Sequence, residues 1–127
     1  MSKRHGDLYD KMLTLDALHA AYLRGRRGKR RTRSVAEFEA NLGSELLQLQ
    51  QELVVGTYRP RPYRKFWINE TGKPRLIAAP AFRDVVVQHA LYGLVYPIFD
   101  KTFCFDSYGC RKGKGTHRAA DRAQQFL

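Results

Sequence analysis

The stretch RKFWINETGKPRLIAAP, residues 64–80, predicts a β-hairpin and decides the class of the fold. Phe66 and Ile68 alternate with side chains of the opposite face, which is the two-residue period of a strand, and a second strand follows a turn at residues 70–73. The chain on either side favours helices and loops. We therefore expect an α+β fold, mainly helical, with one short antiparallel β-hairpin. Its residues fit an ordinary surface hairpin as well as a basic binding element.

Two amphipathic helices are predicted before the hairpin. Apolar residues recur every three or four positions in residues 7–23, with a break expected near Thr14. A capping box of Ser34 and Glu37 begins the second helix, and Gly56 ends it. The apolar stripe of this second helix should face the core; it consists of Phe38, Leu42, Leu46, Leu49 and Leu53.

An extended connector and a buried helix flank the hairpin. Prolines among residues 56–65 argue against a helix there. Residues 82–99 are apolar over a length that favours a buried helix, although the three valines alone also suit a strand. Asp84 favours the helix dipole at its start and is a candidate partner of Arg83, and Pro97 should kink or end the helix.

Gln88 and His89 are polar interruptions of this apolar helix. A buried polar residue is normally hydrogen-bonded, so His89 is interpreted as a buried and satisfied residue. Gln88 fits such a role equally well as a contact with a nucleic-acid backbone.

Positive charge dominates the composition. The chain of 127 residues has 23 Lys and Arg against 12 Asp and Glu, a net charge of +11, so a polyanionic partner is expected. Cations make up seven of the ten side chains of RGRRGKRRTR, residues 24–33, which should form an open, mobile segment until an anion screens it. Such a run fits a solvated or nuclear-localisation-like segment, or an arm that follows phosphates without reading sequence.

A second basic segment, DSYGCRKGKGTH, covers residues 106–117. Its glycines and cations favour phosphate, but the spacing excludes a P-loop, because only three residues separate Gly109 from Gly113 and no hydroxyl residue directly follows Lys114. The segment fits a basic approach to a helix that Thr116 caps, where an anion would be favoured. It also fits a solvated glycine-rich turn.

Several other classes of function find no support in the sequence. Cys104 and Cys110 have no companion pair, which suits reduced thiols in a cytosolic protein, and with scattered His89 and His117 no metal site is expected. The N-terminus lacks a segment of signal-peptide type and no stretch is long enough to cross a bilayer. We expect a cytoplasmic protein without a membrane partner.

Three blocks in succession resemble the N-terminal and fingers part of bacterial reverse transcriptases of the group II intron, retron and diversity-generating retroelement kind. They are GTYRPRPYRKFWI, then GKPRLIAAPAFRDVVVQHAL, then PIFDKTFCFDSYGCRKGKGTHRAADRAQQFL. The resemblance covers nearly the whole chain and is strongest to the diversity-generating and related unclassified enzymes. It implies the fingers subdomain of a right-hand polymerase, with residues 1–56 as a helical leader and residues 57–127 as the fingers region.

The resemblance also implies roles for individual residues. Arg75 matches the fingers arginine that grips the incoming nucleoside triphosphate, and Lys73 is a weaker match to its companion lysine. Arg83, Asp84 and Gln88 match the next block, although Val85 stands where relatives commonly carry arginine. Ser107, Arg111, Gly113 and His117 match a block that helps to position the template. Together with the basic run, the expected nucleic-acid contacts are Arg24, Arg26, Arg27, Lys29, Arg30, Arg31, Arg83, Gln88, Arg111, Lys112, Lys114 and His117.

Polymerase chemistry in that family needs palm aspartates that hold two Mg²⁺ ions. The chain has no two adjacent aspartates, and Asp100 and Asp106 are interpreted as a helix-end carboxylate and a turn residue. We therefore expect one truncated domain, residues 1–127, without palm and thumb. It should be inactive alone and hold no cofactor or metal, whereas its full-length parent would be an RNA-directed DNA polymerase that uses Mg²⁺.

Three functional hypotheses follow from the sequence. The first is a fingers fragment that binds template RNA, an RNA–DNA hybrid and the incoming nucleotide. The second is a self-standing basic RNA-binding or accessory module without catalysis, which could assemble with a palm from another chain. The third is a remnant whose uncovered apolar face makes it associate with itself.

Overall fold

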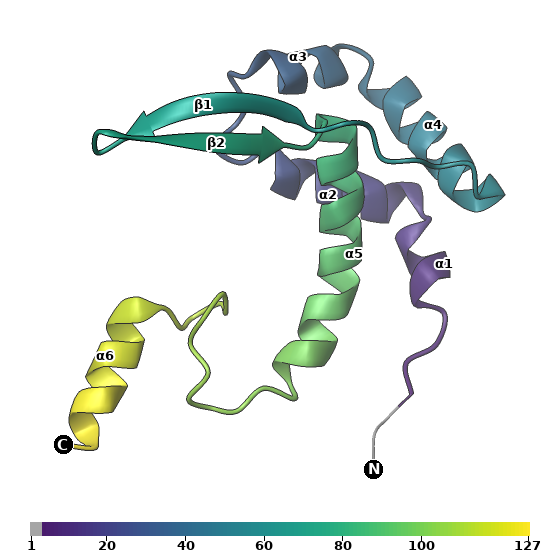
Figure 1. Cartoon of the computed structure of the whole chain (residues 1–127). Helices are drawn as coiled ribbons and strands as arrows, with labels where there is room; N and C mark the ends of the chain where they lie inside the picture. Colours follow the sequence, from purple (N-terminus) through teal and green to yellow (C-terminus); the bar gives the residue numbers. More distant parts are fainter. Residues whose placement is uncertain (1–3) are drawn as a thin grey trace. The chain divides into compact units, whose positions relative to one another are not determined.

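The computed structural model describes residues 4–127, and it is mainly helical with one antiparallel hairpin (Figure 1). This confirms the predicted α+β class. Two compact units divide the chain, one ending at Leu94 and the other comprising Val95–Leu127, so the boundary falls within one long helix. In chain order the elements are α1 (Leu8–Met12), α2 (Leu15–Gly25), α3 (Arg33–Ala40), α4 (Leu42–Val55), β1 (Arg64–Glu70), β2 (Lys73–Ala79), α5 (Phe82–Asp100) and α6 (Thr116–Gln125).

The expected break near Thr14 is confirmed, because Thr14 is the N-cap of α2. Its hydroxyl oxygen accepts a hydrogen bond from the backbone N–H of Ala17 at 3.1 Å. This bond satisfies one of the amide groups that a helix leaves unpaired at its start. Helix α1 ends at Met12, and the apolar face of α2 buries Leu18 and Tyr22.

The prediction of one helix from Ser34 to Gly56 is wrong in two respects. Asn41, with φ −127° and ψ 40°, separates α3 from α4. The N-cap of α3 is Thr32, and Glu37 accepts a hydrogen bond from Arg33 in place of closing a capping box. The C-terminal stop is confirmed: Gly56 caps α4 with φ 84°, a left-handed conformation that glycine adopts without strain.

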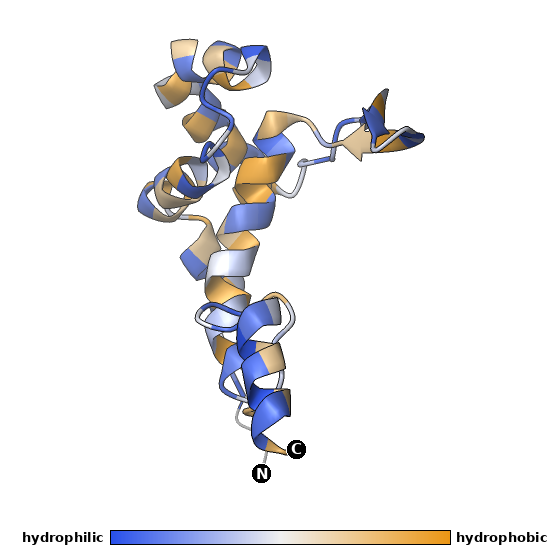
Figure 2. Ribbon diagram, turned by 90° about the vertical axis from the view of Figure 1, so that its left-hand side faces the viewer, coloured by the Kyte–Doolittle hydropathy of each residue, from blue (hydrophilic) through white to orange (hydrophobic). Residues whose placement is uncertain are grey.

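The core of the first unit is built from the apolar stripes of α2, α3, α4 and the start of α5. Leu18, Val35, Leu49 and Val86 are fully buried. Phe38 and Phe82 meet edge to face with ring centroids 5.0 Å apart. Hydrophobic and hydrophilic residues alternate along these helices, as amphipathic packing requires (Figure 2). The predicted apolar stripe of residues 38–53 is confirmed as part of this core.

The hairpin forms around the predicted turn, with Glu70 opposite Lys73 in the antiparallel register. Thr71 and Gly72 both have positive φ, which suits the tight turn between strands of right-handed twist. All seven residues of β1 are exposed, so the hairpin extends outside the helical core of its unit.

The helical reading of residues 82–99 is confirmed, and α5 continues past Pro97 to Asp100. The helix therefore does not end at Pro97, and a kink there stays a prediction. The expected pairing of Arg83 with Asp84 is wrong. Arg83 pairs with Glu52 on α4, and Asp84 is held by other partners. A helical backbone points adjacent side chains in different directions, so Arg83 and Asp84 serve different neighbours.

The second unit consists of the end of α5, a loop and α6. Gly115 is the N-cap residue of α6, and no side chain caps this end, so the predicted cap by Thr116 is wrong. Thr116 is instead the first residue of the helix. No residue of α6 is fully buried, although its sequence is strongly amphipathic.

The two leucines of α4 provide a test of this core. Leu49 is fully buried and Leu47 is 54% exposed. We expect Leu49→Ala to lower the free energy of unfolding by about 2–5 kcal/mol, because it removes apolar contacts and leaves a cavity. Leu47→Ala should change it by about 0.5 kcal/mol. Urea unfolding measures both values, and equal effects of the two variants would contradict the assignment of this helix face.

Candidate nucleic-acid interface

The first turn of α5 fixes the connector that leads into the hairpin. Asp84 accepts a hydrogen bond from the Tyr58 hydroxyl at 2.5 Å and another from the backbone N–H of Arg61 at 2.8 Å. Burial raises the pKa of Tyr58, and the hydrogen bond to Asp84 raises it further. Tyr58 therefore stays protonated and donates to the carboxylate over the whole physiological range. Asp84, which is buried, thus holds both ends of the segment 58–61.

Arg83 lies in the same turn but faces α4. Its guanidinium forms an ion pair and hydrogen bond with Glu52, and the residue is buried. A buried ion pair is costly to break, because one charge is left without compensation. Arg83 was expected to contact nucleic acid; in this structure its guanidinium is committed to the core.

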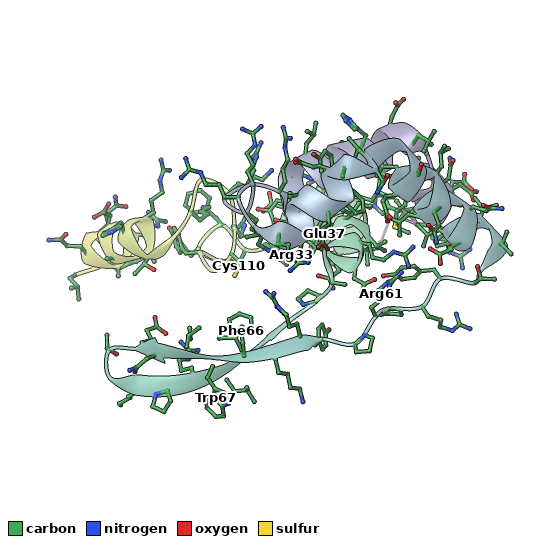
Figure 3. All side chains as sticks on the ribbon, turned by 90° about the horizontal axis from the view of Figure 1, so that it is seen from above. Arg33, Glu37, Arg61, Phe66, Trp67 and Cys110 are labelled. Atoms are coloured by element: carbon green, nitrogen blue, oxygen red, sulfur yellow. The ribbon has the colours of Figure 1, made fainter. Side chains whose placement is uncertain are left out.

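The hairpin presents Lys73 and Arg75 together. The register pairs Ile68 with Arg75 and Glu70 with Lys73, so both cations lie on the face that also carries Phe66. Figure 3 shows Phe66 and Trp67 on opposite faces of the hairpin. Arg75 donates to a carboxylate oxygen of Glu70 at 2.7 Å, and both side chains are more than half exposed. Such an exposed ion pair is weak, so an anion of higher charge can replace Glu70.

The basic run 24–33 divides into structural cations and free ones. Arg26 bonds to the Tyr22 hydroxyl at 3.2 Å and to Glu39 at 3.3 Å. Arg24 donates to the backbone oxygen of His89 at 3.0 Å. Sequence reasoning missed these partners because the run itself contains no acid. The other four cations that were predicted to contact nucleic acid are exposed, and their side chains form no hydrogen bond or ion pair within residues 4–127. They are Arg27, Lys29, Arg30 and Arg31.

A chain of hydrogen bonds fixes the start of this basic run. The Tyr22 hydroxyl donates to Glu39 at 2.6 Å, and this bond, with further help from Arg26, lowers the pKa of the Glu39 carboxyl. Glu39 therefore stays ionised at neutral pH and holds Arg26 against α3. The free cations begin one residue later, at Arg27.

In the second basic segment Arg111 holds the loop together. Its guanidinium donates to Asp100 at 2.8 Å and to the backbone oxygens of Cys104 and Ser107 at 2.8 and 2.9 Å. Its side chain is only 10% exposed. The hydrogen bond from Arg111 lowers the pKa of Asp100. Arg111 is thus bound within the loop, whereas the side chain of Lys112 is exposed.

Lys114 lies against the rings of this loop. Its ammonium nitrogen is 3.8 Å from the centroid of the Phe105 ring and 4.8 Å from that of Tyr108, and it donates to the backbone oxygen of Phe105 at 2.7 Å. These contacts orient Lys114 while leaving it partly exposed. His117 is exposed in the first turn of α6.

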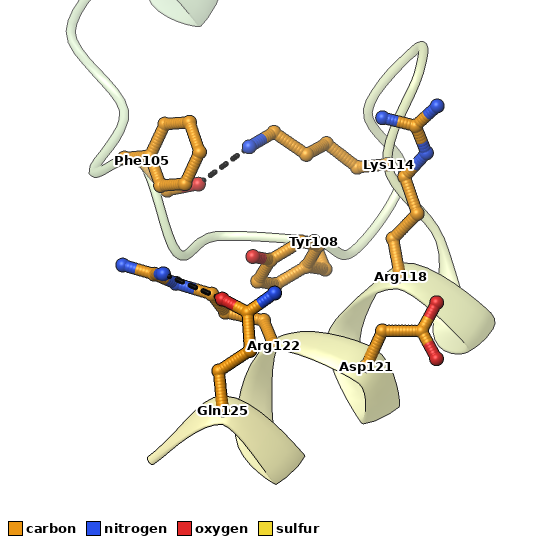
Figure 4. A pocket seen from close by; sticks show the side chains of 7 residues that line it. All are labelled: Phe105, Tyr108, Lys114, Arg118, Asp121, Arg122 and Gln125. Atoms are coloured by element: carbon orange, nitrogen blue, oxygen red, sulfur yellow. Dashed lines mark hydrogen bonds between the residues drawn. The ribbon is translucent and has the colours of Figure 1, made fainter.

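A pocket of about 400 Å³ opens beside Lys114 (Figure 4). Its wall combines rings, cations and hydrogen-bonding groups from the loop and α6: Phe105, Tyr108, Lys114, Arg118, Asp121, Arg122 and Gln125. Arg122 also donates to Asp106 at 2.9 Å. Sequence reasoning missed Arg118 and Arg122, although their spacing of four residues places them on one face of α6. Rings beside cations suit the stacking and charge of a nucleotide.

The remaining candidate residues have simple surroundings. Gln88 is exposed, His89 is half-buried, and together with Tyr92 they line a second pocket of about 330 Å³.

Within residues 4–127, no group of three or more His, Cys, Asp or Glu residues could hold a metal ion. Cys104 and Cys110 are free and exposed. In the same described part of the chain, no helix combines the length and apolar character needed to cross a bilayer.

Each unit therefore exposes free cations and aromatic rings. The chain is similar to known proteins, among them the following. Protein YkfC of Escherichia coli strain K12 is 39% identical over 82 residues, which are 64% of this chain and 22% of YkfC. The group II intron-encoded protein LtrA of Lactococcus lactis subsp. cremoris is 30% identical over 118 residues, which are 88% of this chain and 20% of LtrA. No protein-family model matches the chain.

The chain thus spans about a fifth of the length of these curated relatives. Its similarity to LtrA relates it to a group II intron-encoded protein, which is one of the kinds that the sequence resemblance names. The retron and diversity-generating kinds, and the roles of individual residues, stay predictions.

Arg111 and Arg122 offer a matched test of the second unit. Asp100 and Asp106 both have lowered pKa values, caused first by hydrogen bonds from Arg111 and Arg122 respectively. We expect Arg111→Gln to raise the pKa of Asp100 towards its ordinary value and to leave that of Asp106 low. Arg122→Gln should do the reverse. Carboxyl carbon NMR titration measures both groups in each variant.

The sign of the pH effect follows from the same ion pairs. A carboxyl whose pKa is lower in the folded chain stabilises the fold above its unfolded pKa, and this contribution is lost as the pH falls through the folded pKa. The second unit should therefore loosen in acid, and either glutamine variant should lose less stability on acidification, because one of the two pH-dependent contributions is already absent. A pKa of Asp100 that is unchanged by Arg111→Gln would contradict the loop structure.

Proposed function

We propose that the chain is the fingers region of a reverse transcriptase of the group II intron type, and that it binds template RNA and the incoming nucleotide. The observation that carries this proposal is the exposed hairpin face on which Lys73 and Arg75 lie together beside Phe66. The similarity to the group II intron-encoded protein LtrA over 118 residues supports it.

The hairpin face has the chemistry of a triphosphate site. A guanidinium offers paired donors to phosphate oxygens, and such charge-assisted bonds are stronger than neutral ones. Arg75 is held only by the exposed carboxylate of Glu70, which a triphosphate can displace. Lys73 adds a second positive charge on the same face. The hairpin therefore binds and orients the nucleotide through charge.

The free cations of residues 27–31 suit the backbone of the RNA. Each phosphate that they neutralise releases bound counterions, so binding is tight at low salt and weakens steeply as salt rises. This contact carries no base specificity. The exposed rings Trp67 and Phe66 add flat surfaces on which unpaired bases can stack. The proposed ligands are template RNA and an RNA–DNA hybrid.

Catalysis is proposed to lie outside residues 1–127. Polymerisation of this kind uses carboxylates that hold Mg²⁺ ions. Asp100 and Asp106 accept hydrogen bonds from two different arginines, so neither is presented to a shared ion. In a longer parent chain, a palm would supply these carboxylates and a thumb would complete the grip on the hybrid.

The nucleotide site is tested with two arginines of the same hairpin face. In the 127-residue chain, Arg75→Ala should weaken binding of a nucleoside triphosphate about tenfold, because it removes charge-assisted hydrogen bonds to phosphate. It should weaken RNA binding much less. Arg64→Ala, on the same face at the base of β1, is the matched control for lost charge. Fluorescence anisotropy measures both ligands, and an equal loss of RNA and nucleotide would contradict the role of Arg75.

The RNA contact is tested by the salt dependence of affinity. The variant in which Arg27, Lys29, Arg30 and Arg31 are all alanine should lose about 3 units of slope in a plot of log affinity against log salt for single-stranded RNA. Replacing Lys11 and Lys101, which lie outside the proposed surface, should leave the slope nearly unchanged. A slope that is the same in the quadruple variant would show that these four cations do not contact the backbone.

A further inference from the structure

The guanidinium of Arg24 lies against α5 beside Gly93, where a larger residue would have to displace it. A Cβ atom on Gly93 would be 2.5 Å from Nη2 of Arg24 and 3.3 Å from its Cζ. The same Nη2 donates to the backbone oxygen of His89, one turn earlier on α5. Gly93 and the His89 carbonyl together therefore hold this guanidinium against α5. We call this position the seat of Arg24.

This seated cation lacks an anion. Among residues 4–127 no carboxylate forms an ion pair with Arg24, and its Nε–H is buried without an acceptor. Arg83 also has an unpaired Nε, but its charge is neutralised by Glu52. A buried donor without an acceptor costs free energy, and the cost is larger when the group is charged. Of the two described arginines with an unpaired buried Nε, Arg24 is therefore the one without a carboxylate partner.

A pocket of about 330 Å³ lies beside His89, the residue whose carbonyl accepts the hydrogen bond from Arg24. Gln88, His89 and Tyr92 line it, so His89 belongs both to the pocket wall and, through its carbonyl, to the seat of Arg24. Burial lowers the pKa of the His89 ring, and the charges of Arg24 and Lys29 lower it further. These two cations, one from α2 and one from the turn after it, are the charged groups that act on the ring. An anion placed here would neutralise Arg24 and favour the protonated form of His89.

We propose that Arg24 and His89 form a phosphate site, and that it holds one backbone phosphate of a bound RNA while the pocket beside His89 receives the attached nucleoside. This inference rests on the proposed function, because RNA supplies the phosphate. The exposed cations Arg27, Arg30 and Arg31 follow directly in sequence, so a strand leaving this site meets further positive charge. Gln88 supplies an amide that can bond to the ribose or base.

The site differs in kind from the rest of the basic run. Free surface cations hold phosphates loosely and exchange among them, whereas Arg24 is fixed by packing and a hydrogen bond. Binding of phosphate here is coupled to protonation of His89, because the anion favours the charged imidazole. RNA affinity therefore gains a pH dependence that lysines and arginines alone cannot give.

The first experiment follows the His89 ring by NMR in the 127-residue chain. Its pKa is measured at constant ionic strength without ligand, with adenosine monophosphate, and with a short single-stranded RNA. We expect RNA to raise the pKa of His89 by about one unit, equivalent to about tenfold tighter binding to the protonated form. If the pKa of His89 rises with RNA but not with adenosine monophosphate, the site binds a backbone phosphodiester. If it rises with each of the two ligands, the site binds phosphate groups in general.

RNA binding without any shift of the His89 pKa overturns this inference and leaves the proposed function standing. Absence of RNA binding overturns both.

A second experiment tests whether the fixed position of Arg24, and not only its positive charge, contributes to RNA binding. Gly93→Ala keeps every charge but displaces Arg24 from its seat, and it should weaken RNA binding about tenfold without lowering the melting temperature, because alanine favours helix. Arg24→Ala should weaken binding more than Arg27→Ala, which removes the same charge from the exposed part of the run. His89→Gln should abolish the pH dependence of affinity. Equal effects of Arg24→Ala and Arg27→Ala, together with wild-type affinity of Gly93→Ala, would refute the site.

Discussion

The first turn of α5 is the constraint on which the first unit depends. Asp84 accepts hydrogen bonds from Tyr58 and from the backbone of Arg61, and Arg83 forms a buried ion pair with Glu52. Phe82, in the same turn, packs against the core. One helical turn therefore joins α4, the connector and α5. Because the connector leads directly into β1, this turn also fixes the base from which the hairpin extends.

The cations of the chain divide by what surrounds them. Three arginines form ion pairs with carboxylates inside the fold and therefore stabilise it: Arg26, Arg83 and Arg111. The exposed cations of residues 27–31 have no such partner and are available to an anion. Arg24 belongs to neither group, since it is fixed in place but not neutralised. This division explains how a chain with a net charge of +11 can have an ordered core.

The hairpin poses a different physical problem. A two-stranded hairpin is marginally stable in water, and this one exposes Trp67 and Leu76 on the face opposite Phe66. Its order depends on the turn at Thr71 and Gly72 and on the anchor at Asp84. Such an element can adjust to a ligand at little cost, which suits a part that contacts both a nucleotide and a template strand.

The sequence predicted those features that depend on local patterns. The hairpin turn, the break at Thr14 and the stop at Gly56 follow from residue types and from apolar periodicity, and all three are confirmed. The break at Asn41 was missed because the apolar spacing continues across it.

Ion pairs between residues far apart in the sequence could not be predicted from local patterns. Glu39 for Arg26 and Glu52 for Arg83 lie 13 and 31 residues away along the chain, and periodicity carries no information on such contacts. The sequence showed where the two basic segments lie, but it did not show which of their cations are free of protein partners. The seat of Arg24 on Gly93 depends on two helices meeting, so no local pattern indicated it.

The free cations and the hairpin face of the first unit are proposed to bind RNA. Photochemical cross-linking of the 127-residue chain to 4-thiouridine RNA, with mass-spectrometric mapping of the linked peptides, tests it most directly. Cross-links are expected in the basic run, residues 24–33, and in the hairpin, residues 64–79, with Phe66 and Trp67 among the linked residues. Cross-links confined to α1 and α4 would contradict RNA binding by these segments.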